Sequence, residues 1–97
     1  MIIMIECSSS TKNHLVAKEV ANQLGFPILT KWNGSHNMDG IIAGNHMERS
    51  YMRQADVGIY LFGDGTFSKD DSYVEFEQFN VSTPDVVHDI CAFIREQ

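Results

Sequence analysis

Short apolar runs alternate with longer amphipathic stretches along this chain, which is the pattern of strands separated by helices. The first run, residues 2–5, is continuously apolar, as is typical of a strand buried on both faces. Apolar side chains then recur at helical spacing up to Gly25, which favours a helix stop. Ser10 and Thr11 are both suited to cap the start of that helix.

The same alternation continues to the end of the chain. The elements expected after the first helix are, in order, a strand at residues 26–31, a loop at 32–40, a weaker helix at 41–55, a strong buried strand at 57–62, a strand or short helix at 73–81, and a last helix opened by Thr83, Pro84 and Asp85. The order β-α-β-α-β-β-α predicts one small three-layer α/β domain over residues 1–97. Its sheet is expected to be mostly parallel, with about four strands.

Ligands of such open sheets bind beyond the carboxyl ends of the strands. Three polar loops are predicted at that edge, at residues 7–12, 31–32 and 63–66. In the first loop, small residues let the backbone approach a phosphate, hydroxyls add donors, and a lysine adds charge at the helix start. We therefore expect a small phosphate-bearing ligand there, contacted by Ser8, Ser9, Ser10, Thr11 and Lys12. An ordinary capped helix start is the structural alternative.

Three residues outside this loop are secondary candidates at the rim of the site. Trp32 offers a ring for a base, Arg49 a guanidinium for a phosphate, and Asp64 an oxygen for a metal or a water. Their alternatives are core packing, a solvated basic face shared with Arg53, and a plain Asp-Gly turn. The four histidines share no metal-ligand spacing, so the only cofactor considered is Mg²⁺ arriving with a nucleotide.

Charge and composition narrow the class of partner. The net charge is −6 and only 7 residues are Lys or Arg, which argues against a nucleic-acid partner. No apolar run approaches the length of a membrane span, and the N-terminal run lacks the basic flank of a signal peptide. Cys7 and Cys91 lie at opposite ends of the chain and form no disulfide framework, so a cytoplasmic location is expected.

Several segments carry a resemblance to a known family. They are the strand that ends in Glu6, the helix segment LVAKEVANQLG at residues 15–25, the strand segment DVGIYL at 56–61, and the terminus STPDVV at 82–87. Together they resemble P-loop nucleoside and nucleotide kinases, especially the thymidylate-kinase-like ones. The resemblance covers about half of the chain and implies a nucleotide ligand.

The phosphate loop departs from that family's pattern. In place of G-x-x-x-x-G-K-S/T the chain has C-S-S-S-T-K-N, which is one residue shorter and retains only Lys12. Asn13 stands where the family has the hydroxyl that binds Mg²⁺. The resemblance therefore implies a reduced relative that binds a nucleotide or nucleoside phosphate without phosphoryl transfer.

Other classes of function stay open. Residues 55–61 followed by 71–75 resemble nucleoside 2-deoxyribosyltransferases, which implies an enzyme acting on an N-glycosidic bond with Glu75 as nucleophile. The first loop is similar to the phosphocysteine loop of sugar-phosphotransferase B subunits, with Cys7 as nucleophile, and to the FMN-phosphate loop of flavodoxins. The remaining class is a non-catalytic interaction protein that binds another protein or a second copy of itself.

Overall fold

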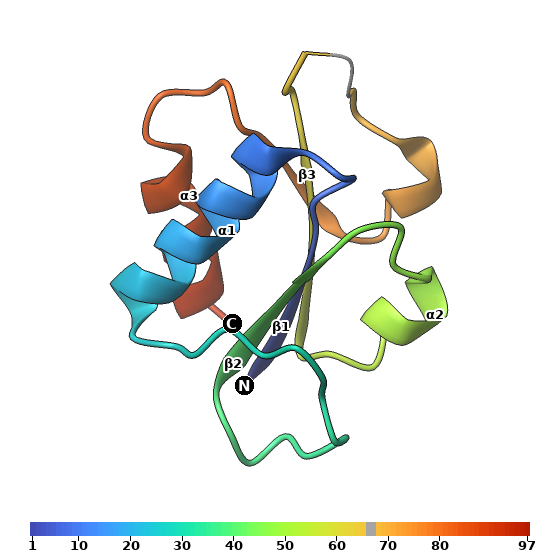
Figure 1. The fold of residues 1–97 in the computed structure, drawn as a ribbon, viewed down its shortest axis with the longest axis vertical. Coiled ribbons are helices and arrows are strands. Elements are labelled where there is room, and N and C mark those ends of the chain that lie inside the picture. The colour runs from blue at the N-terminus through green and yellow to red at the C-terminus, as the bar shows by residue number, and fades with distance from the viewer. Residues whose placement is uncertain (66–67) are drawn as a thin grey trace.

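A computed structural model shows the chain as a sheet between two layers of helices (Figure 1), and it describes residues 1–65 and 68–97. The elements are β1 (Ile2–Glu6), α1 (Thr11–Leu24), β2 (Gly40–Gly44), α2 (Arg49–Met52), β3 (Val57–Phe62), the 3-10 turn η1 (Asp71–Tyr73), β4 (Glu77–Asn80) and α3 (Val86–Arg95). The predicted fold class, a small three-layer α/β domain, is confirmed.

The sheet is parallel throughout, with the strand order β2-β1-β3-β4. β1 lies in its centre, and every residue of β1 is buried, which explains its continuous apolar run. Ile3 pairs with Ile41 of β2 on one side and with Val57 of β3 on the other. Outside β2, the backbone of residues 27–29 exchanges two hydrogen bonds with Ile41, of 2.8 and 2.9 Å.

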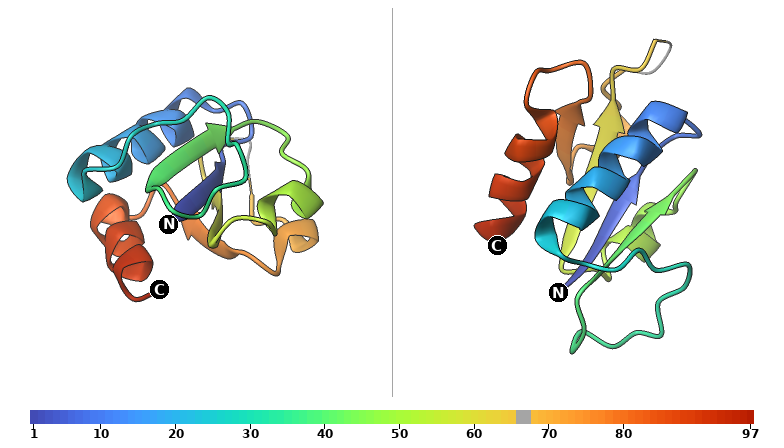
Figure 2. Two further views of the ribbon diagram at one scale, coloured as in Figure 1. Left: turned by 90° about the horizontal axis from the view of Figure 1, so that it is seen from below. Right: turned by 60° about the vertical axis from the view of Figure 1, so that its left-hand side comes forward.

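Each face of the sheet carries its own apolar cluster. α1 and α3 cover one face, while α2 and η1 lie on the other (Figure 2). Because side chains alternate along a strand, Ile3 and Ile5 pack in the cluster under α1 and α3, and Ile2 packs with Trp32 and Met52 on the opposite face.

The ends of α1 form as the sequence predicts. Ser10 is the N-cap, and its Oγ accepts a hydrogen bond from the backbone N–H of Asn13 at 3.1 Å. Gly25 ends the helix at a φ of 72°, a conformation that glycine adopts without strain.

Several predicted boundaries are wrong. The helix expected over residues 41–55 is β2 followed by the single turn of α2, because the apolar run of Gly40–Gly44 pairs along buried β1. The strand expected over residues 26–31 is reduced to a bridge at Ile28, and Pro27 has no N–H to extend it.

The C-terminal third also differs in detail. The segment expected as a strand over residues 73–81 holds η1 and then β4, so both alternatives are present in part. The last helix begins at Val86, three residues after Thr83, because Asp85 adopts a left-handed φ of 63°. His88 on this helix is exposed, as the sequence predicts.

Candidate functional site

Two of the three predicted loops meet at the carboxyl edge of the sheet. The Oγ of Ser10, after β1, donates a hydrogen bond of 2.5 Å to the Oδ2 of Asp64, after β3. The chain winds outward from β1 in both directions, so this contact lies at the topological switch point of the sheet. Thr66, the last residue of the predicted third loop, lies outside the described residues.

A loop that the sequence did not predict, residues 45–47 after β2, also reaches this edge. The Oδ1 of Asn45 accepts a hydrogen bond of 2.8 Å from the backbone N–H of Ser9 and lies 2.7 Å from the Nε2 of His14. The Nε2 of His46 lies 3.3 Å from the Oγ of Ser9. The sequence assigned no role to Asn45 and His46, because the pattern over residues 41–55 predicted a helix there.

Trp32 does not reach this edge. Its ring is buried with Ile2 and Met4, and its indole N–H donates to the backbone oxygen of Ser35 at 2.7 Å. The expected placement at the rim is wrong because residues 26–31 do not form the strand that would have carried Trp32 there. Trp32 instead packs in the core, which was the structural alternative for this residue.

The carboxylate of Glu6, at the end of β1, links the loops after β1 and β2 through hydrogen bonds. Its side chain is buried, and its Oε2 accepts hydrogen bonds from the backbone N–H of Ser8 at 2.6 Å and of His46 at 3.0 Å. Its Oε1 accepts a third bond, of 2.5 Å, from the N–H of Met47. One carboxylate therefore fixes both loops. The sequence signal was an acid at the end of an apolar strand.

These contacts use backbone donors that a phosphate loop would offer to its ligand. The N–H groups of Ser8, Ser9 and Ser10 donate to Glu6, to the Oδ1 of Asn45 and to the backbone oxygen of Cys7. The Ser9, Thr11 and Lys12 side chains remain exposed on the outer surface of the loop. The loop therefore presents mainly side-chain groups to a ligand.

The Cys7 thiol does not fit a nucleophilic role. It is fully buried, and burial together with the neighbouring Glu6 raises its pKa to about 12. A thiol with that pKa stays protonated near neutrality and is a poor nucleophile. The phosphocysteine chemistry implied by one resemblance of this loop is thus not supported at Cys7.

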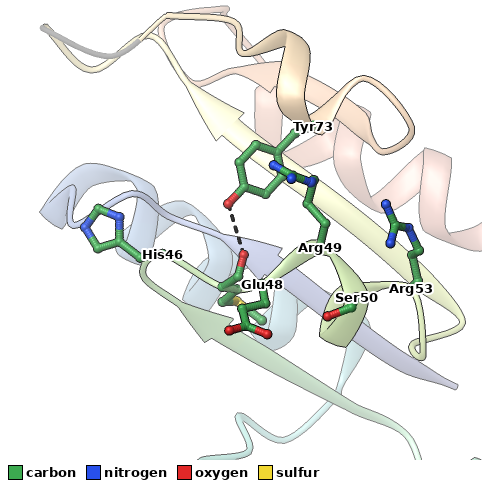
Figure 3. Close-up of a pocket in the computed structure, with 7 residues that line it drawn as sticks. His46, Glu48, Arg49, Ser50, Arg53 and Tyr73 are labelled. Carbon is green, nitrogen blue, oxygen red and sulfur yellow. Dashed lines mark hydrogen bonds between the residues drawn. The ribbon is translucent and has the colours of Figure 1, made fainter.

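A cavity of about 440 Å³ opens beside this edge, between α2 and η1 (Figure 3). Its lining residues are His46, Met47, Glu48, Arg49, Ser50, Arg53 and Tyr73. Figure 3 shows His46 at one end of the lining and Arg53 at the other, with Arg49 and Tyr73 between them. The cavity thus brings Arg49 together with His46, although the sequence placed Arg49 only on a loosely predicted helix.

Tyr73 is held firmly in the wall of this cavity. Its hydroxyl donates a hydrogen bond of 3.0 Å to the backbone oxygen of Met47, and its ring stacks on Tyr60 at 4.8 Å between centroids. The guanidinium carbon of Arg49 lies 6.0 Å from the centre of the Tyr73 ring, within the range of a cation–π contact.

The two arginines differ in their partners. Arg53 makes a bidentate ion pair with Glu75, with both N–O distances at 2.7 Å. Among the described residues Arg49 makes no ion pair, so its charge is available to a ligand. The hydrogen bonds from Arg53 lower the pKa of Glu75, which is therefore ionised beside the cavity.

The fold and this edge define a small, doubly wound α/β domain with a polar cavity beside the carboxyl ends of its strands, lined by two arginines. Comparisons with protein-family models, with curated proteins and with solved structures found no match to this chain. No helix within residues 1–65 and 68–97 has the length and apolar character needed to span a membrane. The same residues hold no cluster of three or more His, Cys, Asp or Glu side chains suited to a metal ion.

Proposed function

We propose that this domain binds a nucleotide or nucleoside phosphate, without phosphoryl transfer, and seats the phosphate in the cavity between α2 and η1. The observation that carries the proposal is the guanidinium of Arg49 in the lining, which makes no ion pair among the described residues. His46 and Arg53 line the same cavity, together with Glu48, and Arg53 is paired with Glu75. In a protein with a net charge of −6, a guanidinium without a carboxylate partner favours an anionic ligand.

Arg49 is the principal anchor in this proposal. Guanidinium groups bind phosphate oxygens through two parallel hydrogen bonds, and a guanidinium without a carboxylate partner has these donors free. The Tyr73 ring against Arg49 limits the orientations of the guanidinium and so reduces the entropy lost on binding. Arg53 contributes less because Glu75 already neutralises it.

The loop after β1 extends the site at the His46 end of the cavity. Ser9 contacts His46 directly, and Lys12 lies on the exposed first turn of α1 that follows this loop. A ligand with a longer phosphate chain would pass from Arg49 toward these groups. The occupied N–H groups of Ser8, Ser9 and Ser10 support binding without the triphosphate wrapping that phosphoryl transfer requires.

Thermal unfolding with nucleoside mono-, di- and triphosphates, with and without Mg²⁺, tests this proposal. A ligand at 100 times its dissociation constant adds about 2.7 kcal/mol of stability. For a domain of this size that corresponds to a rise in Tm of roughly 10 °C or more. We expect Arg49→Ala to abolish the shift and Arg49→Lys to retain part of it, because lysine keeps the charge but loses the bidentate contact.

Arg95→Ala is the matched control, because Arg95 is an exposed arginine on α3, across the sheet from the cavity. Lys12→Ala reports whether the loop contributes: an unchanged shift would confine the ligand to the cavity. A shift that survives Arg49→Ala would refute the assignment of the phosphate to this cavity. A panel without any shift, together with a concentration-dependent mass in sedimentation, would favour an interaction protein.

One observation favours a second candidate, an enzyme acting on N-glycosidic bonds. Glu75 is ionised and is held at the margin of the cavity by Arg53. Under this alternative, Glu75→Gln abolishes exchange of the base of a nucleoside, followed by chromatography, while nucleotide binding persists. Turnover that survives this substitution would exclude Glu75 as nucleophile.

A further inference from the structure

The carboxyl edge of the sheet holds most of the unusual backbone in this chain. Of the four described residues other than glycine with positive φ, three lie here: Ser8 at 51°, Ser9 at 62° and His46 at 53°. Such conformations cost free energy, and in proteins they concentrate at functional sites. Here they turn two loops toward one another, one after β1 and one after β2.

Glu6 fixes the positions of these two loops. A single oxygen, Oε2, accepts the N–H of Ser8 and the N–H of His46, so the residue before Ser9 and the histidine itself are bound to the same atom. The Oδ1 of Asn45 holds the N–H of Ser9. The result places the Nε2 of His46 3.3 Å from the exposed Oγ of Ser9.

We infer that Ser9 is a nucleophile with His46 as its general base. Ser9 sits on a strained turn between a buried strand and a helix, and this arrangement exposes a seryl oxygen at the sheet edge. A base within hydrogen-bonding reach of that oxygen is the second requirement for nucleophilic catalysis. The neighbouring candidates fail: Cys7 is buried, and the Ser10 oxygen is buried between Asp64 and the N–H of Asn13.

The chemistry assigned to this pair is hydrolysis of a carboxylic ester. The Oγ of Ser9 bonds to the carbonyl carbon and its proton passes to the Nε2 of His46. The ester C–O bond then breaks, and the leaving alcohol takes that proton. His46 then takes a proton from water, whose oxygen bonds to the acyl carbon. The bond between that carbon and the Oγ of Ser9 breaks, the Oγ takes the proton back from His46, and the carboxylic acid is released.

The cavity beside His46 sets the class of substrate. His46 belongs to the same lining as Arg49, so an ester whose acyl part carries a negative charge can place that charge on the guanidinium while its carbonyl reaches Ser9. Among the described residues the His46 side chain has only the contact with Ser9, so the pair is a dyad without a third member. The inference uses the charge of this lining but does not depend on the ligand being a nucleotide.

Labelling with a fluorophosphonate probe and intact-mass measurement test the nucleophile. The Oγ displaces fluoride from the phosphorus and the proton passes to His46. We expect one adduct, mapped to Ser9, and none in Ser9→Gly, a substitution that suits the left-handed backbone and preserves the fold. Labelling of His46→Gln should be roughly 100-fold slower, the usual contribution of a general base.

Ser82→Ala is the control, because Ser82 follows β4 at the same sheet edge and its Oγ donates to the backbone oxygen of Gly63 rather than contacting a histidine. Its labelling should equal that of the parent chain. Labelling that persists in Ser9→Gly, or that is equally fast in His46→Gln, would overturn the inference.

Hydrolysis of two 4-nitrophenyl esters tests the substrate class. The anionic hemisuccinate should react faster than the neutral acetate, and Arg49→Ala should remove this preference by raising KM for the hemisuccinate. Hydrolysis of both esters should slow roughly 100-fold in His46→Gln, as expected for loss of a general base. The Tm of Ser9→Gly without ligand is measured separately, so that loss of labelling in a folded variant supports the nucleophile. Loss of nucleotide binding in Arg49→Ala tests the proposed function and leaves the assignment of Ser9 unaffected.

Discussion

Replacing Glu6 by alanine removes the acceptor that holds the loops after β1 and β2 in place. Three backbone N–H groups, those of Ser8, His46 and Met47, lose their partner in this variant. Because the loops carry Ser9 and His46, the substitution should loosen both the fold and the contact between these two side chains.

The magnitude follows from the number and kind of bonds lost. A hydrogen bond to a charged group contributes roughly 1.5–3 kcal/mol, and a buried donor left without a partner costs about 1–3 kcal/mol. The three N–H groups are partly buried, so water replaces part of what is lost, and we expect Glu6→Ala to cost about 3–5 kcal/mol. The total stability of a domain of this size is about 5–15 kcal/mol, so the loss is a large share of it.

Urea unfolding followed by the fluorescence of Trp32 measures this loss, because Trp32 is the single tryptophan and is buried in the native state. Glu6→Gln should lose less, about 2 kcal/mol, because its amide keeps one acceptor oxygen but turns an NH₂ toward a backbone donor. The control is Glu19→Ala, at an exposed position of α1, which should change stability by less than about 0.5 kcal/mol. A loss below about 1 kcal/mol in Glu6→Ala would refute the role assigned to this carboxylate.

Three further predictions concern other parts of the structure. A Cβ at Gly58 would lie 2.4 Å from a ring carbon of Phe76, so Gly58→Ala should cost about 1–3 kcal/mol in urea unfolding as the ring is displaced. With a pKa of about 12, the thiol of Cys7 should resist iodoacetamide in the native protein and react once the chain unfolds, as followed by mass spectrometry. The hydrogen bond from the N–H of Ile2, with a smaller contribution from His36, holds the pKa of Asp56 below its ordinary 3.8. Its stabilisation is therefore present above pH 3.8 and is lost as pH falls through the lower native pKa. Asp56→Asn should show a shallower acid-induced loss of stability than the parent chain.

The sequence predicts those elements whose signals are local. β1 and β3 are continuous apolar runs, and α1 has its cap and its glycine stop, so each could be placed without knowledge of the rest. The false helix over residues 41–55 had a physical origin. Met47, Tyr51 and Ala55 do pack against one apolar cluster, and their common direction imitates a helical period across a loop and the single turn of α2. Ile41, which began the predicted pattern, lies in β2 and packs on the opposite face of the sheet.

The candidate site was predictable only in part. Parallel strands bring the loops after β1 and β3 to one edge, so the approach of Ser10 to Asp64 follows from the fold class. The cavity is different, because Arg49 and Tyr73 come from segments that only the folded chain places together. The role of Glu6 likewise depends on N–H groups from a loop some 40 residues away along the chain.

The two margins of the sheet are unequal, and this restricts how copies of the protein can associate through their backbones. Residues 27–29 already pair with Ile41 on the outer side of β2, and Pro27 offers no N–H to a further strand. β4 is the opposite margin, with the exposed Glu77 at its start and no strand outside it among the described residues. β4 is thus the more open of the two margins for backbone pairing between molecules. A pair joined through β4 of both copies would consume both β4 margins and leave only the β2 margins outside, where residues 27–29 restrict further pairing to the end of the strand.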